Sequence, residues 1–235
     1  MTSDSNINNP DREANMDTTG SGSDDNTTKI DSDMLSAAVR AIKSGELVVY
    51  PTETVYGLGV DALNPDAIKR VFDTKGRTYD NPLSLAVESV SAVARHTNPS
   101  ERAMQFIKAF LPGPVTVIVE CSTAVPDILT AGRDRVGIRI PDHHVALSLL
   151  ERAAPTPITA TSANQSGTGS IVDTNMLAQS IQQNVAVVLE AGETTGTEST
   201  VVDPTRNVIH RRGAMADAVI AWLSDVSGTR PTIES

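Results

Sequence analysis

Stretches with helical spacing of apolar residues alternate with short β-favouring runs along most of the chain. Apolar residues three and four positions apart predict helices, over residues 32–44, 64–74, 99–110, 143–152, 173–181 and 214–223. Short apolar runs rich in valine and isoleucine predict strands, over residues 47–50, 83–87, 115–119, 136–140, 157–160, 185–189, 199–203 and 207–210. Strands that alternate with helices predict a mixed α/β sheet with flanking helices.

The stretch 47–87 contains the densest group of signals. Its first apolar run, LVVY, stops at a proline, so the polar segment PTET (51–54) follows at a strand end. Strand ends are where α/β sheets bind their ligands. We interpret Gly57 and Gly59 as a glycine turn after this segment.

Two cations and a polar run are the strongest candidates for a site. The pattern predicts that Lys75 and Arg77 lie in a loop just past a helix, at a cavity mouth, where their charges suit phosphate oxygens. Taken alone, the two residues would more readily be interpreted as solvated surface charges after a helix C-terminus. The run TSANQSG (161–167) changes this balance, because it places small hydrogen-bonding residues at another strand end. Ser162 and Asn164, two positions apart, are expected to point the same way.

The composition predicts one folded domain with a tail at each end. Residues 1–30 are polar and acidic with almost no bulky apolar residue, which predicts a disordered tail. Residues 31–225 have enough apolar content for a single core. Residues 226–235 are expected to form a flexible C-terminal tail. No additional C-terminal domain is expected after them.

Charge and cysteine content narrow the function classes. The formal charge is −10, but residues 1–33 contribute −6 of it, so the remaining body is only mildly acidic. Such a body offers no long-range attraction to nucleic acid. Cys121 is the only cysteine, which fits a reducing compartment. With no long apolar stretch and no export signal, the sequence predicts a cytoplasmic protein without membrane contact.

Four motifs in a fixed order give the chain a family resemblance. PTETVYGLG, KGR, DNPL and the distant TSANQSG together resemble the YrdC family of threonylcarbamoyl-adenylate synthases. The resemblance runs from about Ser32 to about Gly213 and implies a twisted mixed sheet with flanking helices around a central cavity. From the resemblance we expect the single-domain type of the family.

The resemblance also implies which residues form the site. In the family's pattern, the catalytic cations are Lys75 and Arg77, and the ATP contacts are Lys75, Arg77, Asn81, Ser162, Asn164 and Arg211. The threonine contacts are Thr54, Arg139 and Ser199. Arg212 is an alternative to its neighbour Arg211 as the ATP contact. Several relatives have a histidine where this chain has Ala86, so one threonine contact stays unassigned.

The implied reaction joins L-threonine, bicarbonate or carbon dioxide, and ATP into threonylcarbamoyl-AMP and pyrophosphate, for tRNA modification. Mg²⁺ would come with ATP, held mainly by phosphates and water. The product would pass to a tRNA threonylcarbamoyl transferase complex, and the sequence leaves direct tRNA binding open. No protein metal site is predicted, since His143 and His144 lack ligand spacing to a further Cys or His.

Two other function classes remain open from the sequence. A non-catalytic RNA-binding regulator of the same fold would use Lys75 and Arg77 on phosphate backbones. A dinucleotide-binding enzyme would use the G-x-G-x-x-A pattern at 57–62, with Asp80 near the expected acidic position. That pattern needs a helix beginning inside the turn, and Asn64 and Pro65 postpone the helix.

Overall fold

A computed structural model describes residues 32–234, and the predicted disordered tail at 1–30 lies outside the described residues. Its helices are α1 (Ser32–Lys43), α2 (Pro65–Lys75), α3 (Val90–Val93), α4 (Glu101–Phe110), α5 (Asp127–Thr130), α6 (His144–Ala153), the 3₁₀ turn η1 (Thr174–Met176), α7 (Gln179–Gln182) and α8 (Ala216–Ser227). Its strands are β1 (Leu47–Tyr50), β2 (Gly57–Gly59), β3 (Ser84–Ala86), β4 (Val115–Glu120), β5 (Arg135–Arg139), β6 (Ile158–Ser162), β7 (Val185–Val188), β8 (Thr200–Asp203), β9 (Val208–Arg211) and β10 (Thr232–Ile233).

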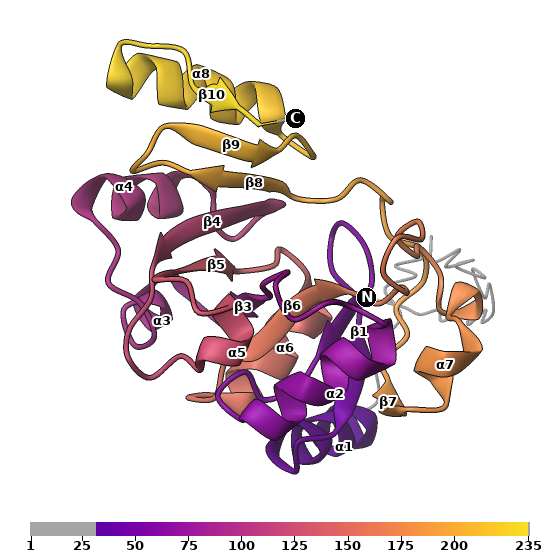
Figure 1. The fold of residues 1–235 in the computed structure, drawn as a ribbon. Coiled ribbons are helices and arrows are strands. Elements are labelled where there is room, and N and C mark those ends of the chain that lie inside the picture. The colour runs from indigo at the N-terminus through magenta and orange to yellow at the C-terminus, as the bar shows by residue number, and fades with distance from the viewer. Residues whose placement is uncertain (1–31, 235) are drawn as a thin grey trace, which may run out of the picture.

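Within the described range, these strands form a ten-stranded sheet in the order β10-β9-β8-β4-β5-β3-β6-β2-β1-β7 (Figure 1). Parallel pairs such as β3 with β5 stand beside antiparallel pairs such as β4 with β5. The predicted mixed α/β fold is therefore confirmed. The predicted hairpin of β8 and β9 is also present as an antiparallel pair.

Two apolar clusters pack the helices against the sheet. One buries α1 and α6 together with β1 residues such as Val48. The larger cluster includes Phe72 of α2, Phe106 of α4, Leu129 of α5 and Val219 of α8. Together they hold the strand ends in fixed positions, which is what a site built on those ends requires.

The caps of α2 explain where its last residues lie. The Asn64 side chain accepts hydrogen bonds from the backbone N–H groups of Asp66 and Ala67, as expected of an N-cap. At the other end, Gly76 takes the left-handed conformation with φ of 59°, which suits a glycine. Lys75 is therefore the last helical residue, and the prediction that it lies in a loop past the helix was wrong by one residue.

The predicted glycine turn is instead a strand. Gly57 and Gly59 lie in β2, which pairs antiparallel with both β1 and β6. A Cβ on Gly57 would lie 2.7 Å from the Tyr50 ring, so these positions need glycine because an aromatic ring packs on the strand. No helix opens there, since α2 begins only at Pro65. The dinucleotide-binding interpretation is therefore wrong.

Two further expectations differ from the structure. The helix predicted over 173–181 is divided into η1 and α7, with Asp173 capping η1 through the Asn175 N–H. The expected flexible tail at 226–235 is ordered over its described part, because α8 continues to Ser227 and β10 pairs in parallel with β9. Among residues 32–234, no helix is both long enough and apolar enough to cross a membrane.

Candidate active site

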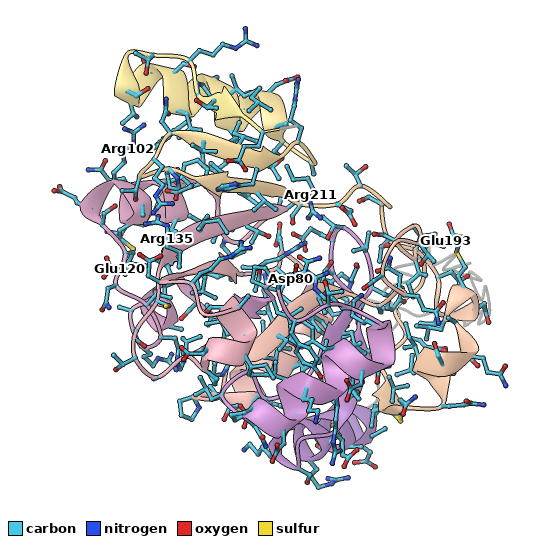
Figure 2. The ribbon with its side chains drawn as sticks, in the orientation of Figure 1. Asp80, Arg102, Glu120, Arg135, Glu193 and Arg211 are labelled. Carbon is cyan, nitrogen blue, oxygen red and sulfur yellow. The ribbon has the colours of Figure 1, made fainter. Side chains whose placement is uncertain are left out.

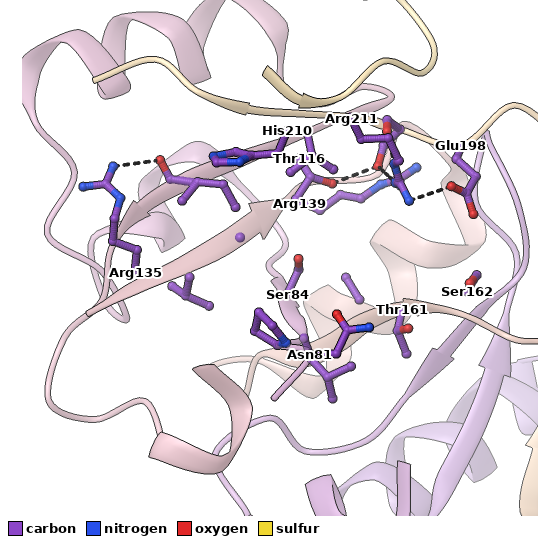
Figure 3. Close-up of a pocket in the computed structure, with 18 of the residues that line it drawn as sticks. Asn81, Ser84, Thr116, Arg135, Arg139, Thr161, Ser162, Glu198, His210 and Arg211 are labelled. Atoms are coloured by element: carbon purple, nitrogen blue, oxygen red, sulfur yellow. Dashed lines mark hydrogen bonds and ion pairs between the residues drawn. The ribbon is translucent and has the colours of Figure 1, made fainter. Parts of the chain in front are cut away.

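A cavity of about 660 Å³ lies among the strand ends. Figure 2 shows Arg135 and Arg211, two of its lining residues, at separate places along this part of the sheet. Its wall includes six of the nine predicted site residues: Arg77, Asn81, Arg139, Ser162, Ser199 and Arg211. Figure 3 labels four of them, Asn81, Arg139, Ser162 and Arg211. These residues come from segments more than 100 positions apart in the chain, so the fold brings the predicted motifs to one place.

Lys75 lies behind the cavity wall rather than at its mouth. Its side chain is only 3% exposed. Its Nζ donates to the carbonyl oxygens of Ser162 and Asn164, the latter at 2.6 Å, and to Asn164 Oδ1 at 3.3 Å. Burial, together with the nearby Arg77 charge, lowers the pKa of the Lys75 ammonium to about 8. Lys75 therefore anchors the TSAN segment to the end of α2.

Asn164 is buried with Lys75 and does not line the cavity. Its Oδ1 accepts a hydrogen bond from the Ser162 hydroxyl, and its Nδ2 donates to the Thr168 carbonyl at 2.6 Å. Of the Ser-x-Asn pair, Ser162 alone reaches the cavity wall. The asparagine holds the serine and the following loop in position.

Arg77 holds the loop that carries Asn81 and Pro82. Its Nε donates to the Asn81 carbonyl at 2.9 Å, and its Nη2 donates to Asn81 Oδ1 at 2.7 Å and to the Pro82 carbonyl at 2.8 Å. Burial and the charge of Arg211 lower the pKa of the Arg77 guanidinium. Two like charges thus face the same cavity from opposite walls, an arrangement suited to an anion that lies between them.

Arg139 is 8% exposed at the end of β5 and is held from several sides. Its Nη2 donates to Thr54 Oγ1 at 2.5 Å and forms an ion pair with Glu53 at 3.0 Å. Thr54 is fully buried behind the arginine, whereas Thr52 lines the cavity. The predicted residue Thr54 therefore positions Arg139, and the sequence interpretation missed Thr52 although it stands in the same motif.

Ser199 and Arg211 lie side by side on the opposite wall. The Arg211 Nη2 donates to Ser199 Oγ at 3.0 Å, and its Nη1 forms an ion pair with Glu198 at 2.6 Å. Burial lowers the pKa of Arg211. Arg212 instead pairs with the exposed Asp217 at 3.0 Å and does not line the cavity. The structure therefore favours Arg211 over Arg212.

Ala86 stands where the family resemblance implies a histidine. It lies in β3 directly opposite Arg139 of β5 and is 1% exposed. A methyl group there has no hydrogen-bonding atom. Ala86 does not line the cavity itself, so this departure lies next to Arg139 and not in the wall.

Several lining residues were missed by the sequence interpretation, among them Ser84, Thr116, Arg133, Arg135, Thr161, Asp203, Arg206 and His210. The sequence did contain one signal, which concerned Arg135. Arg135, Gly137 and Arg139 stand at every second position of β5, and alternate residues of a strand share a face. A Cβ on Gly137 would lie 2.3 Å from Ser84 Oγ, so glycine is needed where β5 meets β3.

The carboxylates of the wall do not form a metal cage. Glu198 is paired with Arg211, and Asp203 with Arg135 at 2.9 Å. Within residues 32–234, no group of three His, Cys, Asp or Glu residues is arranged to hold a metal ion. These donors do not fit a metal held by the protein alone, so any Mg²⁺ here would depend on phosphate and water oxygens.

Comparisons with known proteins assign the family. The family model of Sua5, YciO and YrdC proteins, described as telomere recombination, matches residues 40–213. A threonylcarbamoyl-AMP synthase of Pyrococcus abyssi is 42% identical over 70% of this chain and 48% of its own length, and one of Bacillus subtilis is 40% identical over 72% and 49%.

A solved structure shows the same likeness. The crystal structure of P. abyssi Sua5 complexed with L-threonine has a TM-score of 0.78 and 38% identity, over 86% of this chain and 58% of that one. The chain thus spans about half the length of the curated relatives named here. The family predicted from the four motifs is confirmed: this chain belongs to the Sua5/YciO/YrdC family.

Proposed function

We propose that this chain makes threonylcarbamoyl-AMP and pyrophosphate from L-threonine, bicarbonate or carbon dioxide, and ATP. The observation that carries the proposal is the single cavity in which Arg139 and Ser199 stand beside Arg77 and Arg211. The carboxylate of threonine and the phosphates of ATP could each bind arginines of the same cavity, which would hold the two substrates together. The relatives named as threonylcarbamoyl-AMP synthases support this assignment.

Threonine would bind at the end of the cavity formed by Arg139, Thr52 and Ser199. The guanidinium of Arg139 is held by Thr54 and Glu53, so a carboxylate that binds there would meet a cation whose position is already fixed. Ser199 Oγ lies 2.9 Å from Thr116 Oγ1, which places two hydroxyl groups where the polar substrate would lie. A fixed site of this kind lowers the entropy cost of binding a small substrate.

ATP would lie with its phosphates between Arg77 and Arg211, next to Ser162 and Asn81. Lys75 and Asn164 would act from behind the wall, because their bonds set the position of Ser162. Mg²⁺ would accompany ATP and neutralise phosphate charge, which makes pyrophosphate a better leaving group.

The chemistry needs positioning and charge neutralisation from these residues. The threonine amine adds to carbon dioxide and loses a proton, giving a carbamate. A carbamate oxygen then attacks the α-phosphorus of ATP, and the bond from that phosphorus to the bridging oxygen breaks to release pyrophosphate. Arg77 and Arg211 would stabilise the charge that moves onto the departing pyrophosphate.

We further propose that the product serves tRNA modification through a threonylcarbamoyl transferase complex, and that the reaction takes place in the cytoplasm. The unpaired Cys121 fits a reducing compartment.

An omission experiment tests the proposal. Pyrophosphate release is measured with threonine, bicarbonate and ATP together, and again with each omitted in turn. Full release should require all three. Equal release without threonine would reduce the activity to a generic ATP pyrophosphatase and would refute the proposal. A second amino acid, such as alanine, in place of threonine controls for unspecific stimulation by any amine.

A further inference from the structure

Strand β9 contains a bulge that turns two consecutive side chains to the cavity. Its pairing with β8 shifts between Val201, opposite Arg211, and Val202, opposite Ile209, so His210 is the extra residue. Side chains of a regular strand alternate between faces, and a bulge can re-aim one of them. His210 and Arg211 both line the cavity, as Figure 3 shows for the two labelled side chains.

The C-terminal segment holds the bulged histidine. Strand β10 pairs in parallel with β9, and the Glu234 N–H donates to the Ile209 carbonyl at 2.9 Å. The Glu234 Oε2 then lies 2.6 Å from His210 Nδ1. A carboxylate only accepts hydrogen bonds, so Nδ1 donates and Nε2 remains as the second polar atom of the ring. The segment that follows α8 thus fixes the orientation of a cavity side chain.

The cavity near His210 has a different character from the end with Arg77. Arg135, at the start of β5, and Arg206 both pair with the buried carboxylate of Asp203, at 2.9 Å and 3.8 Å, so part of the positive charge is compensated there. The wall between these groups includes the apolar side chains Ile118, Val136 and Val201. Partly compensated charge beside an apolar wall suits a flat, uncharged group with a few polar atoms, which is the chemistry of a nucleoside.

We infer that His210 contacts the nucleoside part of ATP and that Glu234 is the positioning residue that orients it. The inference rests on the proposed function, which places the phosphates at Arg77 and Arg211. The nucleoside then extends along β5 toward Arg135, past the bulge of β9. Glu234 acts only through His210, by holding Nδ1.

Two ligands distinguish contacts to the nucleoside from contacts to the phosphates. Binding of a non-hydrolysable ATP analogue and of inorganic tripolyphosphate is measured by calorimetry for the parent, His210→Ala, Glu234→Ala and Glu234→Gln. Loss of one hydrogen bond should weaken binding of the analogue about 3- to 10-fold in His210→Ala and Glu234→Ala. Tripolyphosphate binding should stay within about 2-fold of the parent, because it lacks a nucleoside.

Two controls keep the test specific. Glu234→Gln retains an oxygen that accepts from Nδ1 and should recover most of the analogue affinity. Glu193→Gln changes an exposed glutamate well away from β9 (Figure 2) and should change the affinity for neither ligand. Melting temperatures should be equal among all variants within about 2 °C, since these side chains are partly exposed.

The outcomes are distinguishable. Unchanged analogue affinity in His210→Ala would overturn the inference and leave the proposed function standing. Equal weakening of both ligands would show a general disturbance of the wall, which also overturns it. A parent that binds neither ligand would refute the proposed function itself.

Discussion

Lys75 stabilises the fold through the hydrogen bonds that its ammonium donates and destabilises it through the cost of burying the charge. Replacing Lys75 with methionine should separate these two effects. Methionine has a similar length but no donor, so the carbonyl oxygens of Ser162 and Asn164 lose their partner. Each buried bond to a charged donor is worth about 1.5–3 kcal/mol. Burial of the ammonium offsets about 3 kcal/mol of this, because it lowers the pKa from 10.5 to about 8. The free energy of unfolding at pH 7 should therefore fall by up to about 3 kcal/mol.

The lowered pKa of Lys75 also determines whether the free energy of unfolding rises or falls with pH. Below pH 8, Lys75 is protonated in both states, and the cost of burying its charge is fully present. Between pH 8 and 10.5 the folded state releases the proton while the unfolded state keeps it, so stability rises with pH. The stability of the parent relative to Lys75→Met should therefore increase by about 3 kcal/mol across this window and stay constant below it.

Urea unfolding at several pH values between 6 and 10.5 measures this difference, and pyrophosphate release measures activity. Lys69→Met is the matched control, because Lys69 is exposed on the same helix. The stability of the parent relative to Lys69→Met should not change with pH, and the turnover of Lys69→Met should equal that of the parent. Turnover of Lys75→Met should fall about 10-fold or more, because Ser162 loses its anchor. A flat pH profile with parental turnover would show that Lys75 is neither a buried charge nor an anchor of the site.

Three further substitutions test the wall. Arg77→Lys keeps the charge but cannot reproduce the bonds to Asn81 and Pro82, so pyrophosphate release should fall about 10-fold, and parental turnover would contradict the loop-holding role. Glu53→Gln breaks the partly buried ion pair with Arg139 and should lower the unfolding free energy by about 1.5–3 kcal/mol in urea titrations, whereas an unchanged midpoint would show that the pair is dispensable. Gly137→Ala places a Cβ 2.3 Å from Ser84 Oγ and should lower the melting temperature, with partial recovery on adding Ser84→Ala; no recovery would place the clash elsewhere.

The positions of helices and strands could be predicted from the sequence better than the pairing of the strands. Apolar spacing located α1, α2, α4 and α6 to within a few residues, because amphipathic helices and buried strands carry their periodicity in the sequence itself. The short helices α3 and α5 were missed, since four residues are too few to show a period. The sheet order, with β8 beside β4, depends on pairings between distant segments that no local pattern records.

The site was predicted in part for the same reason. Motifs that share one loop or strand end, such as Arg77 with Asn81, were visible as neighbours in the chain. His210 was not, because its place in the wall depends on a bulge and on β10, a segment that composition alone predicted to be a flexible tail. Burial of Lys75 was also invisible, since it requires that the TSAN segment supply its oxygens at the right distance.

The charges of the wall indicate where an anion would bind first. Arg139, Arg211 and Arg135 are each paired with a carboxylate, so much of their field is compensated before any ligand arrives. Lys75 and Arg77, by contrast, donate to neutral oxygens of Ser162, Asn164, Asn81 and Pro82. Neutral oxygens solvate a cation without cancelling its charge, and burial strengthens its field. Burial and the nearby like charges lower the pKa values of both cations: Arg77 acts on Lys75, and Arg211 acts on Arg77. A phosphate that enters the cavity would therefore contact Arg77, which lines it, and its negative charge would also offset the repulsion between Arg77 and the buried Lys75 behind the wall.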